Sequence, residues 1–201
     1  MRQIILAIIF SVIIIFATGC GRIVHRIDPP KFRQDMAVYV SAVTEIQASE
    51  IADFGLVTRS LTQKQASFRK MVADVRADVA DGWTQGAVDD VYLWMLKNHI
   101  YCLGHCVKTT ISLHNLYNNG LKGDCKSLHF GMGAILKYYL GCPYKMEIVI
   151  YEPYIEPGFH FCLRVNGKTY DLQKWLAIVA TCGLSKIRGE FVSFEIYRGS
   201  K

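Results

Sequence analysis

The dipeptide Asn166-Gly167 is the feature that most constrains the fold of this 201-residue chain. Asn-Gly favours the positive φ angles of a two-residue hairpin turn, and β-rich segments flank it at 159–165 and 168–172. A two-residue turn also fixes the register of the two strands that it joins. The sequence therefore predicts an antiparallel hairpin with a defined register in the last quarter of the chain.

The register of this hairpin decides which side chains share a face. The expected pairs are Val165 with Lys168, Cys162 with Asp171, and His160 with Gln173. Side chains alternate between faces along a strand, so one face carries His160, Cys162, Asp171 and Gln173. Diagonal neighbours on one face are close enough to interact. We therefore expect a hydrogen bond of about 2.6 to 3.2 Å between His160 and Asp171.

A helix is expected to begin just before Cys125. Asp124 is a favourable N-cap, and Gly141 and Pro143 are typical of the end of a helix. Between them, apolar residues recur at helical spacing: Leu128, Met132, Ile135, Leu136 and Tyr139. Cys125 would thus lie in the first turn, where the positive end of the helix dipole stabilises a thiolate.

Cys125, His160 and Asp171 together form a candidate catalytic set. The thiolate would be the nucleophile, the imidazole the base, and the carboxylate the group that orients the imidazole. In one alternative, Cys125 is a buried structural residue and the polar hairpin residues face water. In another, His129, one helical turn after Cys125, is the base.

An oxyanion intermediate would need hydrogen-bond donors. The backbone N–H of Cys125 is one candidate. The candidate side chains are Asn119 (six residues before Cys125), its neighbour Asn118, and Gln173 on the hairpin. Asn119-Gly120 can also be explained as a simple turn.

The rest of the chain predicts the fold class. Helices are expected at 60–81 and 87–100, and the segment 35–54 favours helix over strand. A further strand is expected at 145–151, before the hairpin. Helices followed by antiparallel strands indicate an α+β fold.

These motifs, in this order, resemble the transglutaminase-like cysteine hydrolase superfamily over roughly residues 88–175. The matching segments are 93–101, Gly123-Asp124-Cys125-Lys126, 140–143, 158–160 and 166–172. The resemblance implies a papain-like core, in which the helix that begins with the nucleophile packs on an antiparallel sheet. It also implies that Cys125, His160 and Asp171 hydrolyse peptide or isopeptide bonds, or transfer their acyl groups.

The resemblance implies no cofactor. Some members of the superfamily depend on calcium, but no carboxylate cluster for calcium is visible in the sequence. Cys102, His105 and Cys106 could bind a metal ion, although they lack the first His and the Glu of a zinc-protease helix. No metal is expected.

The N-terminus resembles a bacterial lipoprotein signal. Residues 4–16 form an apolar run of roughly 13 residues, shorter than the about 20 that span a bilayer. The run ends in Ala17-Thr18-Gly19-Cys20, which is similar to a lipobox, so Cys20 is the expected lipidation site. Gly21 favours the outer membrane, if the cell has one. An ordinary secretory signal and an uncleaved anchor are the alternatives, and all three place the protein outside the cytoplasm.

The expected organisation is a signal peptide at 1–19, a lipidated tether at 20–34, a helical extension at 35–86 and a transglutaminase-like catalytic domain at 87–201. The net charge of +6 is spread along the chain without a basic run interleaved with aromatics, so no nucleic-acid partner is expected. The expected partners are a protein or peptide substrate, and the membrane through the N-terminal lipid.

The sequence thus predicts a thiol hydrolase of the cell envelope that faces the periplasm or the exterior. The alternative is a catalytically weak or inactive lipoprotein that serves as a binding or assembly module on the same fold.

Overall fold

A computed structural model describes six segments of the chain: residues 29–50, 62–101, 112–118, 120–151, 159–173 and 190–197. The chain divides into two units, residues 1–32 and 33–201. Of the first unit, only the residues that begin helix α2 are described. Cys20, Asn119, Cys102, His105 and Cys106 lie outside the described residues. The expected helical extension and catalytic domain, 35–86 and 87–201, both belong to the second unit.

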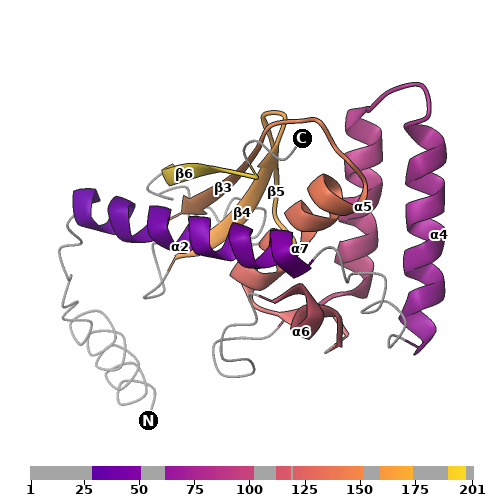
Figure 1. The fold of residues 1–201 in the computed structure, drawn as a ribbon, viewed down its shortest axis with the longest axis horizontal. Helices are drawn as coiled ribbons and strands as arrows, with labels where there is room; N and C mark the ends of the chain where they lie inside the picture. Colours follow the sequence, from indigo (N-terminus) through magenta and orange to yellow (C-terminus); the bar gives the residue numbers. More distant parts are fainter. Residues whose placement is uncertain are drawn as a thin grey trace, which may run out of the picture. The chain divides into compact units, whose positions relative to one another are not determined.

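Five α-helices are described (Figure 1). They are α2 (Pro29–Glu50), α4 (Thr62–Asp78), α5 (Gln85–Asn98), α6 (Leu113–Asn118) and α7 (Cys125–Ala134). α7 continues into a π-helical turn, η3 (Ile135–Tyr139), and the chain then turns at Gly141 with a φ of 73°. The helices expected from the sequence are therefore present, and none of the described helices is both long enough and apolar enough to cross a membrane.

The start of α2 differs from the expected tether. The helix begins at Pro29, so residues 29–34 are helical instead of extended. Two consecutive prolines disfavour helix in the residues before them, but a proline in the first turn loses no helical hydrogen bond and already has a helical φ. Pro29 and Pro30 therefore begin this helix.

An antiparallel sheet of four strands follows the helices. The strands are β3 (Met146–Tyr151), β4 (His160–Val165), β5 (Lys168–Tyr170) and β6 (Glu190–Ile196), and their order is β5-β4-β3-β6. Two very short strands, β1 (Ile100–Tyr101) and β2 (Lys122–Gly123), form a separate parallel pair. The α+β class is confirmed, whereas β1, β2 and β6 were not predicted.

The β4–β5 hairpin has the predicted turn. Asn166 and Gly167 have φ angles of 50° and 83°, and Val165 pairs with Lys168. The ladder continues in the expected register to the pair of Leu163 and Tyr170 and ends there. The expected pairs beyond it are therefore not made as ladder pairs, and Asp171 lies just outside the strand.

Helix α7 packs against strand β4 of the sheet. It also packs against helices α5 and α6. Two glycines allow this close packing, because a Cβ atom at Gly131 would collide with Leu116, and one at Gly133 would lie 2.9 Å from the ring of Tyr197. The largest fully buried side chains of α7 are Leu128, Phe130 and Met132. The N-terminus of α7 is thereby fixed relative to the sheet.

Helix α5 holds the end of the hairpin. Lys168 forms an ion pair of 2.7 Å with Asp89, and the hydroxyl of Tyr170 donates to the same carboxylate at 2.6 Å. The hydroxyl of Tyr92 donates to the backbone carbonyl of Asp171 at 3.1 Å. α4 packs on the other side of α5, where the rings of Phe68 and Trp94 meet edge to face.

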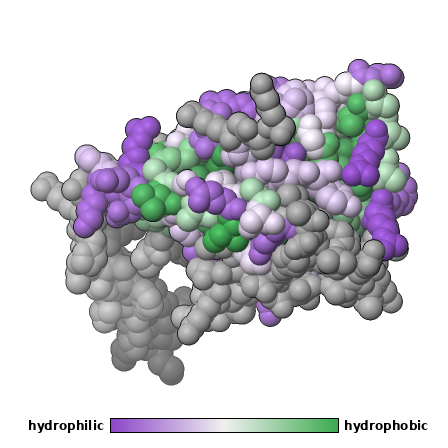
Figure 2. Space-filling view, viewed as in Figure 1, coloured by the Kyte–Doolittle hydropathy of each residue, from purple (hydrophilic) through white to green (hydrophobic). Residues whose placement is uncertain are grey.

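Large apolar side chains are exposed at only a few described positions: Val38, Ile46, Leu93, Ile100 and Tyr101. Among the residues coloured in Figure 2, hydrophobic ones are interspersed with hydrophilic ones. Scattered apolar residues of this kind need no partner protein to explain them.

Candidate active site

Cys125 is the first residue of α7. Its neighbour Asp124 has an extended backbone and caps the helix, because its carboxylate accepts hydrogen bonds of 2.9 Å from both the backbone N–H and the hydroxyl of Ser127. Lys126 places its ammonium 3.6 Å from the other carboxylate oxygen of Asp124. These contacts partly offset the negative charge of Asp124 at the N-terminal end of α7.

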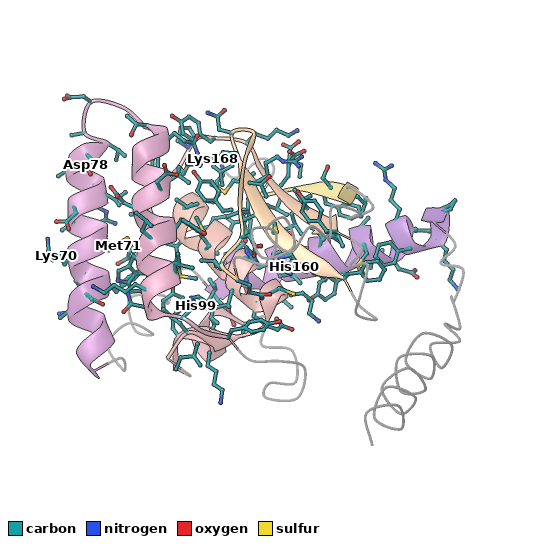
Figure 3. All side chains as sticks on the ribbon, turned by 180° about the vertical axis from the view of Figure 1, so that it is seen from behind. Lys70, Met71, Asp78, His99, His160 and Lys168 are labelled. Atoms are coloured by element: carbon teal, nitrogen blue, oxygen red, sulfur yellow. The ribbon has the colours of Figure 1, made fainter. Side chains whose placement is uncertain are left out.

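His160 is the first residue of β4, and Figure 3 shows it at the sheet, away from His99 at the end of α5. Its Nε2 lies 3.0 Å from Oδ1 of Asp171. The hydrogen bond expected from the hairpin register is therefore present. Both side chains are almost fully buried, at 7% and 9% exposure.

Asp171 is held at both its carboxylate and its backbone carbonyl. Oδ1 also accepts the backbone N–H of Gln173 at 3.0 Å, and Tyr92 holds the Asp171 carbonyl. A carboxylate fixed in this way sets the orientation of the imidazole. Because Nε2 of His160 is hydrogen-bonded to Asp171, Nδ1 is the ring nitrogen that can exchange a proton with the Cys125 sulfur.

Cys125 lies beside the imidazole. Its sulfur is 4.0 Å from the carbonyl oxygen of Phe159, the residue before His160. Burial opposes the charged form of His160, but hydrogen bonds to Asp171 and to the Cys125 and Cys162 sulfurs outweigh it and raise the pKa of His160. The surroundings of His160 therefore favour its charged imidazolium form beside Cys125.

The three described cysteines differ in accessibility. Cys142 and Cys162 are buried, and burial raises the pKa of each thiol to about 11. Cys125 is partly exposed. Of the described cysteines, Cys125 alone combines access from solvent with a helix N-terminus, so the alternative of a buried structural Cys125 is disfavoured.

His129 does not have the environment of a base. It is fully buried, and both ring nitrogens are hydrogen-bonded to the backbone, Nδ1 to the carbonyl of Cys125 at 2.6 Å and Nε2 to the N–H of Leu172 at 3.0 Å. Burial lowers the pKa of His129 to about 4. The geometry favours His160 over His129 as the base.

Gln173 and Asn119 were the side chains expected to stabilise an oxyanion. Asn119 lies outside the described residues. The amide nitrogen of Gln173 is buried and makes no hydrogen bond within the described part of the chain. This buried amide N–H, two residues from Asp171, is suited to donate a hydrogen bond to a ligand oxygen.

Tyr39 of α2 is a neighbour of the site that was not predicted from the sequence. Burial, together with the negative charges of Asp124 and Cys125, raises the pKa of Tyr39 to about 12. Its ring contacts Phe130 of α7 edge to face. The phenol therefore stays protonated near Cys125, but no local motif in the sequence marks a contact between segments so far apart.

One group of potential metal ligands exists among the described residues. A ring nitrogen of His129, the sulfur of Cys162 and a carboxylate oxygen of Asp171 lie within 4.8 Å of one another. Both nitrogens of His129 already bond to the backbone, and Asp171 bonds to His160. The group therefore does not fit a metal site without breaking the contacts that order it.

Replacing Asp171 with asparagine should lower turnover by roughly 100-fold, the low end of what a positioned acid–base group contributes. Asparagine keeps the size of the side chain but loses the charge that stabilises an imidazolium at His160. Steady-state rates would be compared with Asp74→Asn, which removes a carboxylate from the exposed ion pair with Lys70 on α4. Equal rates for Asp171→Asn and the wild type would show that Asp171 does not assist His160.

No protein-family model matches the chain, and neither a curated protein nor a solved structure is significantly similar to it.

Proposed function

We propose that this protein is an extracytoplasmic thiol hydrolase that cleaves peptide or isopeptide amide bonds through Cys125, His160 and Asp171. One observation carries the proposal: a partly exposed cysteine at a helix N-terminus lies beside an imidazole whose far nitrogen is bonded to a buried carboxylate. The sequence motifs resemble those of transglutaminase-like hydrolases, which have a papain-like core, and this resemblance supports the same hypothesis.

In the proposed reaction, the Cys125 thiolate attacks the carbonyl carbon of the substrate amide. The carbonyl oxygen becomes an oxyanion, for which the backbone N–H of Cys125 and the buried amide of Gln173 are the candidate donors. Protonated His160 gives its proton from Nδ1 to the leaving amine as the C–N bond breaks, which leaves a thioester on Cys125. Asp171 stays ionised throughout and stabilises the imidazolium.

Water completes the cycle. Neutral His160 takes a proton from the water as its oxygen attacks the thioester carbon, and the Cys125 thiolate leaves. An amine in place of water would give acyl transfer by the same steps.

The test compares cell-envelope peptides from cells that carry wild type with those that carry Cys125→Ala. We expect peptide ends or free amines that are produced only by the wild type, and that identify the substrate. If the two peptide sets are identical under conditions in which the protein is expressed, the protein acts instead as a binding or assembly module on the same fold.

Membrane attachment through lipid on Cys20 is part of the proposal. Cys20→Ser should leave an unprocessed precursor without lipid, because the thioether to the lipid cannot form on serine. Metabolic labelling with a fatty acid and the mass of the mature N-terminus would measure this, with Cys142→Ser as a matched control. Normal processing and unchanged labelling of Cys20→Ser would contradict lipidation at this residue.

A further inference from the structure

The two hydrogen bonds of His129 join the segments that carry the proposed catalytic groups. One partner is the carbonyl of Cys125 itself, at 2.6 Å, and the other is the N–H of Leu172, the residue after Asp171, at 3.0 Å. The ring of His129 is fully buried and meets the ring of His160 edge to face, with centroids 6.2 Å apart. One imidazole therefore bridges the start of α7 and the end of the hairpin.

This bridge matters because the strand pairing ends before Asp171. The last pair of the ladder between β4 and β5 is Leu163 with Tyr170, so Asp171 contacts β4 through its carboxylate on His160 and not as a paired strand residue. Two side chains from other elements contact the backbone of this segment: Tyr92 of α5 at the carbonyl of Asp171, and His129 of α7 at the N–H of Leu172. Of these two, His129 alone also contacts Cys125.

The protonation state of His129 follows from its partners. A carbonyl only accepts and an N–H only donates, so Nδ1 must carry the proton and Nε2 must be bare. A charged ring would bring a second proton to Nε2, facing the N–H of Leu172, and would break that bond. The titratable groups around His129 are Asp171 after β5, His160 and Cys162 on β4, Cys125 on α7, and His99 at the end of α5.

We propose that His129 is a positioning residue, which sets the place of Asp171 and its partner His160 relative to Cys125 by bridging the two backbone segments. The inference rests on the proposed function, because it assigns His129 a role in aligning that site. His129 touches no reacting atom in this role. A positional change of about 1 Å in a catalytic site can cost on the order of 100-fold in rate.

The test measures the alkylation rate of Cys125 by iodoacetamide in the full chain, from pH 5 to 9, by mass spectrometry of the peptide that contains it. In the wild type we expect alkylation at pH 6 to be faster than that of a cysteine in an unstructured peptide, because His160 lies beside the sulfur and can take up its proton. In His129→Leu, which puts an apolar side chain of similar size in place of the ring and removes both hydrogen bonds, we expect the rate at pH 6 to fall at least about tenfold. Turnover, where a substrate is known, should fall roughly 100-fold.

Two further variants separate positioning from stability. His129→Asn can still donate to the carbonyl of Cys125 and should recover part of the alkylation rate. Val75→Ala removes buried methyl groups from α4, outside the site, and should lower the melting temperature without changing the alkylation profile. A rate loss in Val75→Ala as large as that in His129→Leu would mean that the effect reports stability alone, and would contradict the proposal.

The remaining outcomes are also decisive. Suppose that the wild type is alkylated rapidly at low pH and that folded His129→Leu shows the same pH dependence of alkylation. This result would overturn the positioning role and leave the proposed function intact. A wild-type profile like that of a free thiol would instead contradict the proposed function. If His129→Leu does not fold, the nuclear magnetic resonance signals of the wild-type histidine ring nitrogens decide. A neutral His129 with the proton on Nδ1 from pH 5.5 to 8 supports the bridge. A proton on Nε2, or titration of His129 near pH 6.5, overturns it.

Discussion

Replacing Cys125 with alanine is expected to abolish amide hydrolysis while leaving the protein folded. The substitution removes the nucleophilic sulfur, and loss of the nucleophile costs an enzyme of this kind about 10⁴-fold or more in turnover. The structural cost is modest because the side chain is partly exposed, and the substitution removes the hydrogen bond of its sulfur to His160 and a weak contact of 4.0 Å with the Phe159 carbonyl. Turnover and thermal unfolding of the purified variant would be measured together.

Cys142→Ala is the matched control for this prediction. Cys142 is also a free cysteine, but it is buried after the π-helical turn and has no contact with His160 or Asp171 among the interactions described. This control should lose stability and keep its turnover per folded molecule. Wild-type turnover in Cys125→Ala would show that the mechanism is wrong.

Replacing His160 with glutamine is expected to reduce hydrolysis by roughly 10³- to 10⁴-fold. Glutamine can retain a hydrogen bond to Asp171 but can neither hold an imidazolium charge next to Cys125 nor move a proton. Both the attack by the thiolate and the departure of the amine would suffer. His99→Gln provides the control, since His99 bonds only locally to the carbonyls of Met95 and Leu96 at the end of α5 among its described ring contacts.

The same variant has a pH signature in stability. The folded pKa of His160 is raised, so its charged form contributes stability that is fully present below the unfolded value of about 6.5 and is lost as the pH rises through the folded value. The difference in unfolding free energy between wild type and His160→Gln should therefore shrink as the pH increases above 7. A difference that rises up to about pH 6.5 and stays constant above pH 7 would mean that His160 is neutral in the folded protein.

The hairpin shows how far a local signal can determine a site. The Asn166-Gly167 turn and the alternation of the strands were sufficient to predict that His160 and Asp171 face each other, because both rules depend only on neighbouring residues. The N-cap at Asp124 was predictable for the same reason.

Other parts of the fold depend on contacts that no local pattern encodes. β6 pairs with β3 although about 40 residues separate them in sequence, and such pairing is decided by packing. His129 could be recognised as a neighbour of Cys125 from helical spacing. Its second partner, the N–H of Leu172, becomes available only because the ladder ends at Tyr170.

Whether Cys125 is a nucleophile activated by His160 can be tested by reacting the full chain at neutral pH with a peptide that carries a thiol-reactive electrophile. The product is read out by intact mass and by peptide mapping. We expect one adduct, on Cys125, formed rapidly in the wild type and at least about 100-fold more slowly in His160→Gln. Labelling of Cys125 at the same rate in both proteins, or no labelling of Cys125 in the wild type, would contradict this activation.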